Sequence, residues 1–235
     1  MGTSLHPPQL VTGSRTLYLV WVPEDPDAVA ELVPAGLTSA ADRSCYINQY
    51  VVEGDAQTSA SDGDDAFGAY SLTYLGVNLS GLDTEAGVPG RWWTDYHNSS
   101  EPMIRYAREH GVPAGAPGET TLDLDGDRLV ATTSVEGRPI IRTTARLTIG
   151  TPQRVTGQLR YITSRGGEFV SGRYAYVADI AEEFAVESFE FLDKEHPTYR
   201  LRPAQPLQVT FGFYAPAMSF VYPGGEGPLG SEHGS

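Results

Sequence analysis

A succession of short β-like runs, each bounded by turn residues, dominates this sequence and limits the folds open to it. The runs are rich in branched and aromatic side chains, which favour strands, and Gly, Asp, Asn or Pro stands between them. The expected strands cover residues 16–22, 45–52, 67–77, 119–124, 128–134, 140–149, 155–163, 168–177 and 209–221. Many strands joined by short turns predict a mainly β, α+β fold built on a closed or nearly closed antiparallel β-barrel.

Two helices are expected within the first half of the chain. Asp25 can cap a helix that begins at Pro26, since proline suits the first helical turn. A longer helix is expected after Ser99 or Ser100, with an apolar stripe along one side and a stop at Gly111. The segment 181–192 fits neither period cleanly, so helix and strand both remain open there. Residues 12–222 show no linker or repeat, which predicts one domain followed by a flexible tail over residues 223–235.

The charge balance excludes several classes of partner. The 235 residues include 30 acidic and 16 basic side chains, giving a formal net charge of -14. Such a surface repels polyanions, so we expect neither nucleic acid nor an anionic membrane as a partner. No apolar run is long enough to span a bilayer, and Met1–Pro8 lacks the pattern of a signal peptide. We therefore expect a cytoplasmic protein with a small-molecule ligand.

Metal and nucleotide cofactors are not expected. Cys45 is the only cysteine, and no histidine has a carboxylate at the spacing of a zinc protease. Asp123, Asp125 and Asp127 alternate as in a calcium loop, but Arg128 stands where that loop needs glycine, so a hairpin turn explains them better. There is no Gly-rich loop between a strand and a helix, as dinucleotide binding would need. We expect no cofactor and no metal.

The stretch 90–118 carries the most distinctive pattern. Its blocks are Glu101-Pro102-Met103-Ile104, Ala107-Arg108-Glu109 and Gly111-Val112-Pro113, preceded upstream by Pro34-Ala35-Gly36-Leu37 and Gly68-Ala69-Tyr70. In order and spacing these blocks resemble the acetoacetate decarboxylase family over most of residues 15–150. The resemblance implies a cone-like β-barrel with an interior pocket, and a homo-oligomer.

The departures from that family concern its chemistry. In the family the first lysine after Gly-x-Pro forms a Schiff base with a β-keto acid, and a second lysine lowers its pKa. This sequence has Ala114 and Gly115 at those positions, and Leu72 where the family has a glutamate. A methyl group cannot act as an amine nucleophile, so we expect imine-dependent decarboxylation to be absent. Lys194, the only lysine of the chain, lies in a charged run and is expected to be a hydrated surface side chain.

The candidate site residues follow from the resemblance and from residue chemistry. Arg15, which the resemblance implies is a retained catalytic arginine, is expected to hold a carboxylate or enolate oxygen. The expected proton handlers are Tyr96, His97, Glu109 and His110. The expected pocket lining is Tyr70, Leu72, Tyr74, Trp92, Trp93 and Ala114. Each has a plain structural alternative, because strand aromatics commonly belong to the core and a helical glutamate commonly pairs with an arginine.

Three functions remain open at this point. The first is an enzyme that cyclises, dehydrates or isomerises a polyketide-like or other specialised metabolite without an amine. The second is a binding protein without turnover. The third is a decarboxylase that uses Lys194 or a metal near Arg15 instead of the missing lysine. Polar groups that converge inside an apolar pocket would favour the first over the second.

Overall fold

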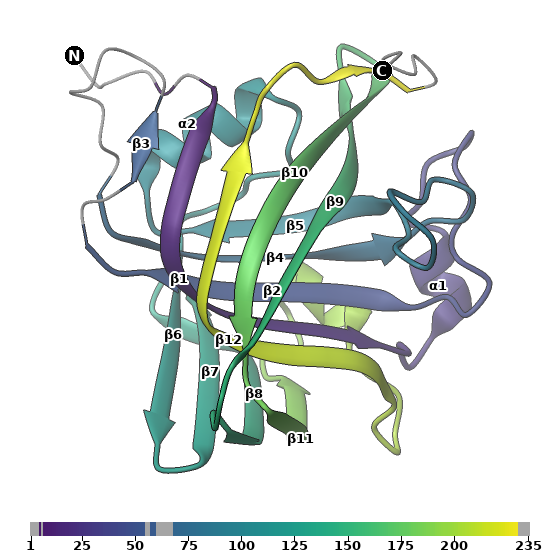
Figure 1. The fold of residues 1–235 in the computed structure, drawn as a ribbon. Helices are drawn as coiled ribbons and strands as arrows, with labels where there is room; N and C mark the ends of the chain where they lie inside the picture. The colour runs from purple at the N-terminus through teal and green to yellow at the C-terminus, as the bar shows by residue number, and fades with distance from the viewer. Residues whose placement is uncertain (1–4, 6, 55–56, 60–67, 230–235) are drawn as a thin grey trace.

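The computed structural model describes residue 5 and residues 7–54, 57–59 and 68–229, with its elements labelled in Figure 1. The longer strands are β1 (Gln9–Trp21), β2 (Cys45–Val52), β4 (Tyr70–Asn78), β5 (Arg91–Asn98), β6 (Gly118–Asp125), β7 (Arg128–Val135), β8 (Arg138–Thr148), β9 (Gln153–Arg165), β10 (Glu168–Ile180), β11 (Glu183–Phe191) and β12 (Val209–Tyr222). The shorter elements are β3 (Thr58–Ser59), β13 (Gly227–Pro228), α1 (Pro26–Ala30), α2 (Glu101–Glu109) and the 3₁₀ helix η1 (Pro197–Leu201).

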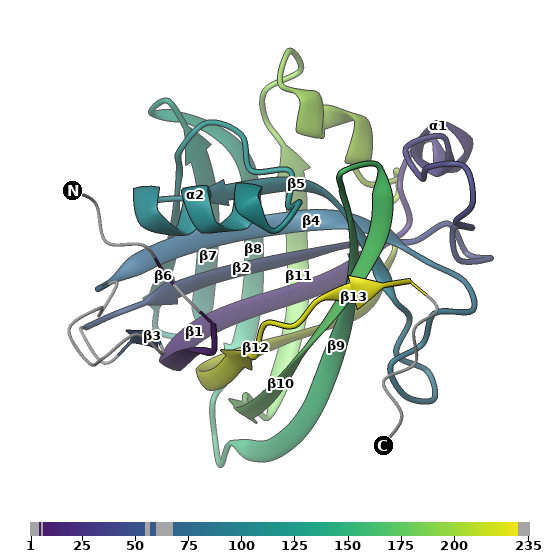
Figure 2. The same ribbon diagram turned by 90° about the horizontal axis from the view of Figure 1, so that it is seen from above.

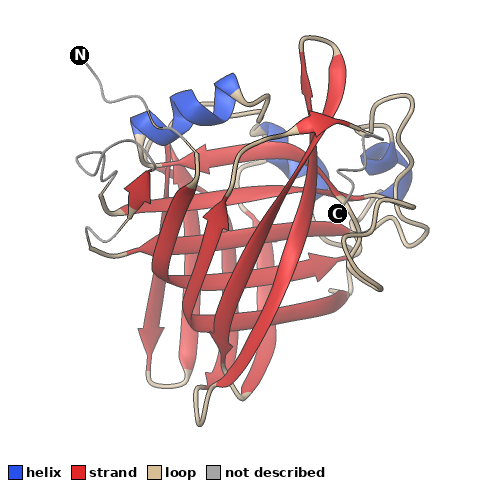
Figure 3. Cartoon of the chain, turned by 45° about the horizontal axis from the view of Figure 1, so that its top comes forward, coloured by secondary structure: helices blue, strands red, loops and turns tan. Residues whose placement is uncertain are grey.

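Seven strands close a barrel in the order β12-β1-β2-β4-β5-β9-β10, and β10 pairs back onto β12. Figure 3 shows that strands make up most of the molecule and that the helices lie at its edges. The β5–β9 pair is parallel, and every other neighbouring pair in this ring is antiparallel. The expected closed, mainly β barrel is confirmed. The barrel is mixed because the chain leaves it after β5, builds a second sheet, and re-enters beside β5 in the same direction.

The second sheet, β11-β8-β7-β6, packs against the outside of the barrel (Figure 1). Strands β1, β2 and β4 are therefore buried on both faces, which explains their nearly continuous apolar sequences. On β1, Tyr18 and Val20 face the barrel interior, whereas Leu17 and Leu19 face the second sheet. The molecule thus has two cores, and strand alternation assigns each side chain to one of them.

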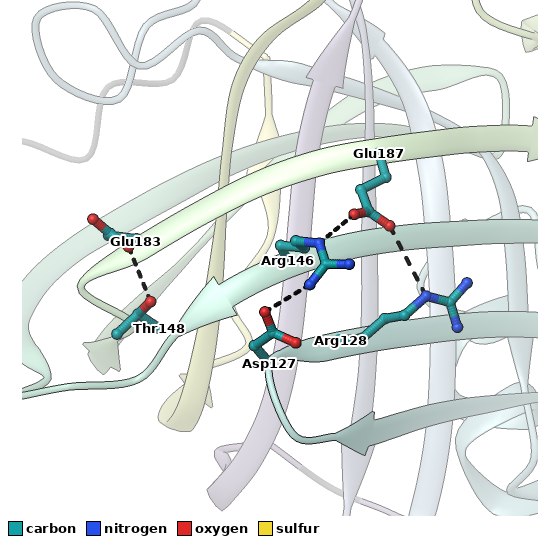
Figure 4. Close-up of polar contacts among 6 residues, drawn as sticks. All are labelled: Asp127, Arg128, Arg146, Thr148, Glu183 and Glu187. Atoms are coloured by element: carbon teal, nitrogen blue, oxygen red, sulfur yellow. Dashed lines mark hydrogen bonds and ion pairs between the residues drawn. The ribbon is translucent and has the colours of Figure 1, made fainter.

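The solvent side of the second sheet carries a polar network (Figure 4). Arg146 contacts Asp127 at 2.7 Å and Glu187 at 2.6 Å, while Arg128 lies 3.9 Å from Glu187. These side chains are exposed, so solvent screens their pairing and the network adds little to stability. Asp127 lies beside the tight turn between β6 and β7, whose register confirms the expected hairpin.

The helix after Ser100 is confirmed as α2. Met103, Ile104 and Ala107 form its buried stripe, and Gly111 ends it with a φ of +78°, a conformation that favours glycine. Figure 2 shows α2 and α1 beside opposite ends of β4 and β5. The open segment 181–192 is resolved as a strand, since β11 pairs with β8.

Strand β5 has no counterpart among the expected strands. A bulge opposite Leu75 and Gly76 interrupts its alternation, so the strand lacks the regular two-residue period that sequence patterns reveal. Gly76 is required there, because a Cβ atom at this position would lie 1.9 Å from the carbonyl oxygen of Trp92.

Part of the segment expected as a tail lies on the barrel. Glu226 accepts a hydrogen bond from Tyr161 of β9, and β13 pairs with β10. Residues 230–235, with His233, and residue His6 lie outside the described part of the chain. Within the described part, no helix has the length and apolar character needed to cross a membrane.

Candidate functional site

The barrel interior is lined by tyrosines. Eight of the 13 tyrosines in the chain belong to the interior core, namely Tyr18, Tyr46, Tyr50, Tyr70, Tyr74, Tyr96, Tyr161 and Tyr174. Several share hydrogen bonds: Tyr50 and Tyr70 lie 3.0 Å apart at their hydroxyls, and Tyr74 contacts the Tyr174 hydroxyl. Burial raises the pKa of Tyr74 to about 12, although its hydrogen bonds with Tyr174 and Asn48 act in the opposite direction. The phenol therefore stays neutral near pH 7 and can donate or accept a hydrogen bond.

One end of this interior lies under α2 and forms a small cavity of about 30 Å³, which we call the α2 niche. Its lining residues are Gln9, Trp93, Tyr96, Met103, Tyr106, Ala107, His110, Val112, Tyr161, Tyr222 and Glu226. Gln9 is fully buried, and neither polar atom of its carboxamide has a partner within the described structure. The Tyr106 hydroxyl also lacks one. Unpartnered buried polar atoms are costly, and they leave hydrogen-bonding capacity for a water or a ligand.

A carboxylate with two hydrogen-bonding partners lines the α2 niche. The Oε2 atom of Glu226 lies 3.1 Å from His110 Nδ1, and its Oε1 atom accepts a hydrogen bond from the Tyr161 hydroxyl at 2.8 Å. Burial alone would raise the pKa of Glu226, but the hydrogen bonds from His110 and Tyr161 outweigh it and lower the pKa to about 2. Glu226 is therefore ionised at neutral pH. An ionised carboxylate favours the His110 tautomer with the proton on Nδ1.

The other end of the interior opens into a cavity of about 390 Å³, which we call the mouth cavity. It is lined by Tyr18, Val20, Ala40, Asp42, Ser44, Asn48, Asn78, Gly87, Val88, Pro89, Arg91, Leu159, Tyr176, Phe211, Phe213 and Met218. Strand geometry separates it from the niche. Arg91 in the mouth and Tyr96 in the niche are five residues apart on β5, a span of about 16 Å.

The structure brings several of the expected site residues into the barrel interior. Tyr70, Leu72, Tyr74, Trp93 and Tyr96 belong to its core, and Ala114 packs against it beside Tyr96. Trp93, Tyr96 and His110 also line the α2 niche. Burial raises the pKa of Tyr96, whose hydroxyl accepts a hydrogen bond from Asn98 at 2.9 Å.

Four expected site residues lie elsewhere. Arg15 points away from the interior, where it pairs with Glu53 and donates to the carbonyl of Leu122 at 2.7 Å. Trp92 contacts Phe169 on the outer face, with 6.0 Å between ring centroids. 

The other two are also remote from the niche. Glu109 is exposed on α2. His97 is buried on the outer face of β5, with its ring centroid 5.4 Å from that of His196. The expected pocket included Trp92 with its neighbour Trp93, and His97 with its neighbour Tyr96. Adjacent residues of a strand point to opposite faces of the sheet, so the two members of each pair cannot line the same pocket.

Sequence reasoning missed four polar residues that line the interior. Arg91 follows directly after Gly90, and only the strand assignment of β5 shows that it faces inward. Gln9 and Tyr161 also alternate inward on their strands. Glu226 lies in a Gly- and Pro-rich stretch that carries no strand signal, so no local pattern points to it.

Neither Lys194 nor a cluster of possible metal ligands lies in the two cavities of the described structure. Lys194 is exposed in the turn before η1 and lines neither cavity. In the described ranges, no three His, Cys, Asp or Glu side chains converge as a metal site would require.

Comparison with solved structures identifies the fold. No protein-family model matches the sequence, and no curated protein matches it either. The enduracididine biosynthesis enzyme MppR complexed with pyruvate superposes with a TM-score of 0.69 at 14% identity, covering 97% of this chain and 92% of that one. Acetoacetate decarboxylase from Legionella pneumophila gives 0.68 at 12% identity, covering 97% and 91%. An acetoacetate decarboxylase-like enzyme from Sphingomonas wittichii gives 0.65 at 16% identity, covering 94% and 92%.

These likenesses define the class of fold. The chain has the acetoacetate decarboxylase-like fold over nearly its whole length, which confirms the resemblance read from residues 15–150. At such low identity the likeness extends to the fold, and the chemistry must be argued from the side chains.

Proposed function

We propose that this chain is an enzyme of the acetoacetate decarboxylase-like fold that works by acid–base chemistry without a Schiff base. Its reaction would be the cyclisation, dehydration or isomerisation of a small, polyketide-like metabolite in the barrel interior. The observation that carries the proposal is the His110–Glu226 pair, a base and its orienting carboxylate that both line the α2 niche.

The geometry supports a role for His110 as the base. With Glu226 accepting a hydrogen bond from the Nδ1–H group, the Nε2 atom keeps its lone pair and can take a proton from a carbon next to a carbonyl group. The resulting enolate oxygen would accept hydrogen bonds from the neutral phenols of Tyr106 and Tyr96. Return of the same proton to a different carbon completes an isomerisation. Its return to a departing hydroxyl group releases water and completes a dehydration.

The absence of an interior lysine supports a mechanism without an imine. Position 114 is an alanine packed against the interior core, and Lys194 is exposed. An exposed amine that lines neither cavity cannot reach a substrate bound in the barrel interior.

A binding protein without turnover is the second candidate. It is favoured by the sizes of the two cavities, because the mouth holds about 390 Å³ and the α2 niche only about 30 Å³. A metabolite would have to displace part of the packing around Glu226 to reach His110.

The test is deuterium exchange at the acidic C–H positions of acetoacetate, 2,4-pentanedione and benzoylacetone, followed by NMR in D₂O. We expect the wild-type protein to accelerate exchange, and His110→Gln and Glu226→Gln to reduce it by about 10²-fold or more. The exposed Glu119→Gln serves as the matched carboxylate control and should retain the wild-type rate. No acceleration with any of the three compounds would leave the binding protein as the better description.

A second measurement addresses the imine. Borohydride reduction in the presence of acetoacetate, followed by intact mass measurement, should give no adduct. An adduct at Lys194 would overturn the amine-free mechanism.

A further inference from the structure

Arg91 is a buried cation that has no anionic partner among the described residues. The residue is 6% exposed at the start of β5, and its Nε and Nη2 atoms donate to the Tyr18 hydroxyl at 3.0 and 2.6 Å. Its guanidinium carbon lies 5.3 Å from the ring centroid of Tyr18 and 5.2 Å from that of Tyr46. The Nη1 atom has no hydrogen-bond partner, and no carboxylate of the described residues lies within 4.0 Å of the guanidinium.

This arrangement is the reverse of what stability alone would favour. Exposed arginines such as Arg154 and Arg202 pair with carboxylates, although solvent makes such pairs weak. Burying an ion without a counter-ion is expensive, and arginine cannot escape the cost by losing its proton. Two rings and one neutral phenol compensate only part of it. The Nη1 atom therefore keeps an unfilled hydrogen bond beside the mouth cavity, and because solvent does not reach this atom, an anion from outside the chain would contact it only after the lining side chains shift.

Two further unpartnered polar atoms belong to residues of the mouth cavity. The Oδ1 atoms of Asn48 and Asn78 are buried without partners among the described residues, and both residues line the cavity. Asp42 lines it too, but its carboxylate already accepts hydrogen bonds from the backbone and hydroxyl of Ser44 at 3.1 and 2.8 Å.

The wall leading out from Arg91 is aromatic. The ring of Tyr18 stacks on Phe213 at 5.4 Å, and Phe211 lies 6.0 Å from both. Phe211 is 56% exposed, which is unusual for a large apolar side chain and places a bare ring on the cavity lining. Val88 and Leu159 add aliphatic surface. A flat apolar group would find stacking and burial along this wall.

We propose that the mouth cavity is a binding site for an aromatic monocarboxylate, with its carboxylate at the Arg91 guanidinium and its ring on Phe213 and Phe211. A cavity of about 390 Å³ suits a ligand of this size. A single guanidinium matches a single negative charge, whereas the acidic protein as a whole disfavours multiply charged ligands. This inference goes beyond the proposed function, because binding here does not depend on proton transfer by His110.

The experiment is isothermal titration calorimetry of the full chain with trans-cinnamate and with its neutral amide, cinnamamide. The two probes share a ring and differ in charge. We expect cinnamate to bind about 10- to 100-fold more tightly, as befits a charge-assisted hydrogen bond in a buried site. Arg91→Met should remove that advantage and leave cinnamamide binding unchanged. Equal affinity for the two probes, no detectable cinnamate binding, or an unaffected Arg91→Met variant would each overturn the proposal.

A rim variant keeps the test independent of folding. Phe211→Ser alters an exposed ring and should weaken both probes by about the same factor, roughly 3- to 10-fold. Unchanged binding of both would show that the aromatic wall is not used and would overturn that part of the proposal. Glu226→Gln, at the other end of the barrel, should keep full cinnamate affinity. Anion binding and proton exchange can therefore fail separately.

Discussion

At the α2 end of the barrel the buried carboxylate of Glu226 has two hydrogen-bonding partners. At the mouth the buried guanidinium of Arg91 contacts a phenol and two aromatic rings, and its Nη1 atom has no hydrogen-bond partner among the described residues. Both charges lie inside the same barrel. The difference teaches that burial of a charge does not by itself reveal its role. A charge whose partners come from the chain organises the side chains around it, and a charge left open is suited to a ligand.

The largest effect on stability is expected at the bulge of β5, the strand that carries residues of both cavities. Gly76→Ala places a methyl group against the carbonyl of Trp92, at the bulge that turns Arg91 and Tyr96 inward. We expect a loss of at least about 3 kcal/mol in the free energy of unfolding, measured by urea denaturation. Gly115→Ala is the matched control, since a Cβ there meets nothing within 4 Å. A Gly76→Ala protein of wild-type stability would mean that the bulge does not position either end.

The next effect concerns His97, which lies on the outer face of the same strand. Burial lowers its pKa to about 4, with His196 acting in the same direction and Asp95 opposing. The unfolded chain binds this proton near pH 6.5, so stability is lost as pH falls from 6.5 towards 4, by roughly 2 to 3 kcal/mol near pH 4.5. His97→Leu should flatten this part of the pH profile. Because His97 is outside both cavities, cinnamate affinity at pH 7 should stay unchanged.

Glu226→Gln tests the paired charge at the α2 end. The lowered pKa of Glu226 means that its contribution is present above pH 4.5 and is lost as pH falls towards 2. Allowing for partial exposure and screening, we expect the variant to lose about 2 kcal/mol at pH 7. Its stability should depend less on pH between 4.5 and 2 than that of wild type. Thermal and urea unfolding across this window provide the measurement, with Glu119→Gln as control.

Arg91→Met should give the smallest effect and the opposite sign. Removing an unpaired buried charge relieves its desolvation, and methionine fills a similar volume, so we expect a gain of about 1 kcal/mol. A loss of several kcal/mol would instead mark Arg91 as a structural group, and the contrast between the two ends would disappear.

Much of the fold could be predicted from the sequence because strand and helix signals are local. The apolar stripe and glycine stop predicted α2, and the Asp125-Gly126 turn predicted the β6–β7 hairpin. Strand β5 could not be predicted in the same way, because its bulge breaks the regular alternation. That one omission explains why Trp92 and His97 were expected in the pocket and why Arg91 was overlooked.

The sequence by itself determined which chemical groups exist: a single lysine, an alanine at position 114, and a set of strands rich enough in tyrosine to line a barrel. Only the tertiary structure decided which of those groups meet. Each barrel strand has two faces, and closure of the sheet assigns one of them to the interior. Glu226 reaches His110 across 116 residues of chain, a contact that depends on long-range packing and leaves no trace in local sequence.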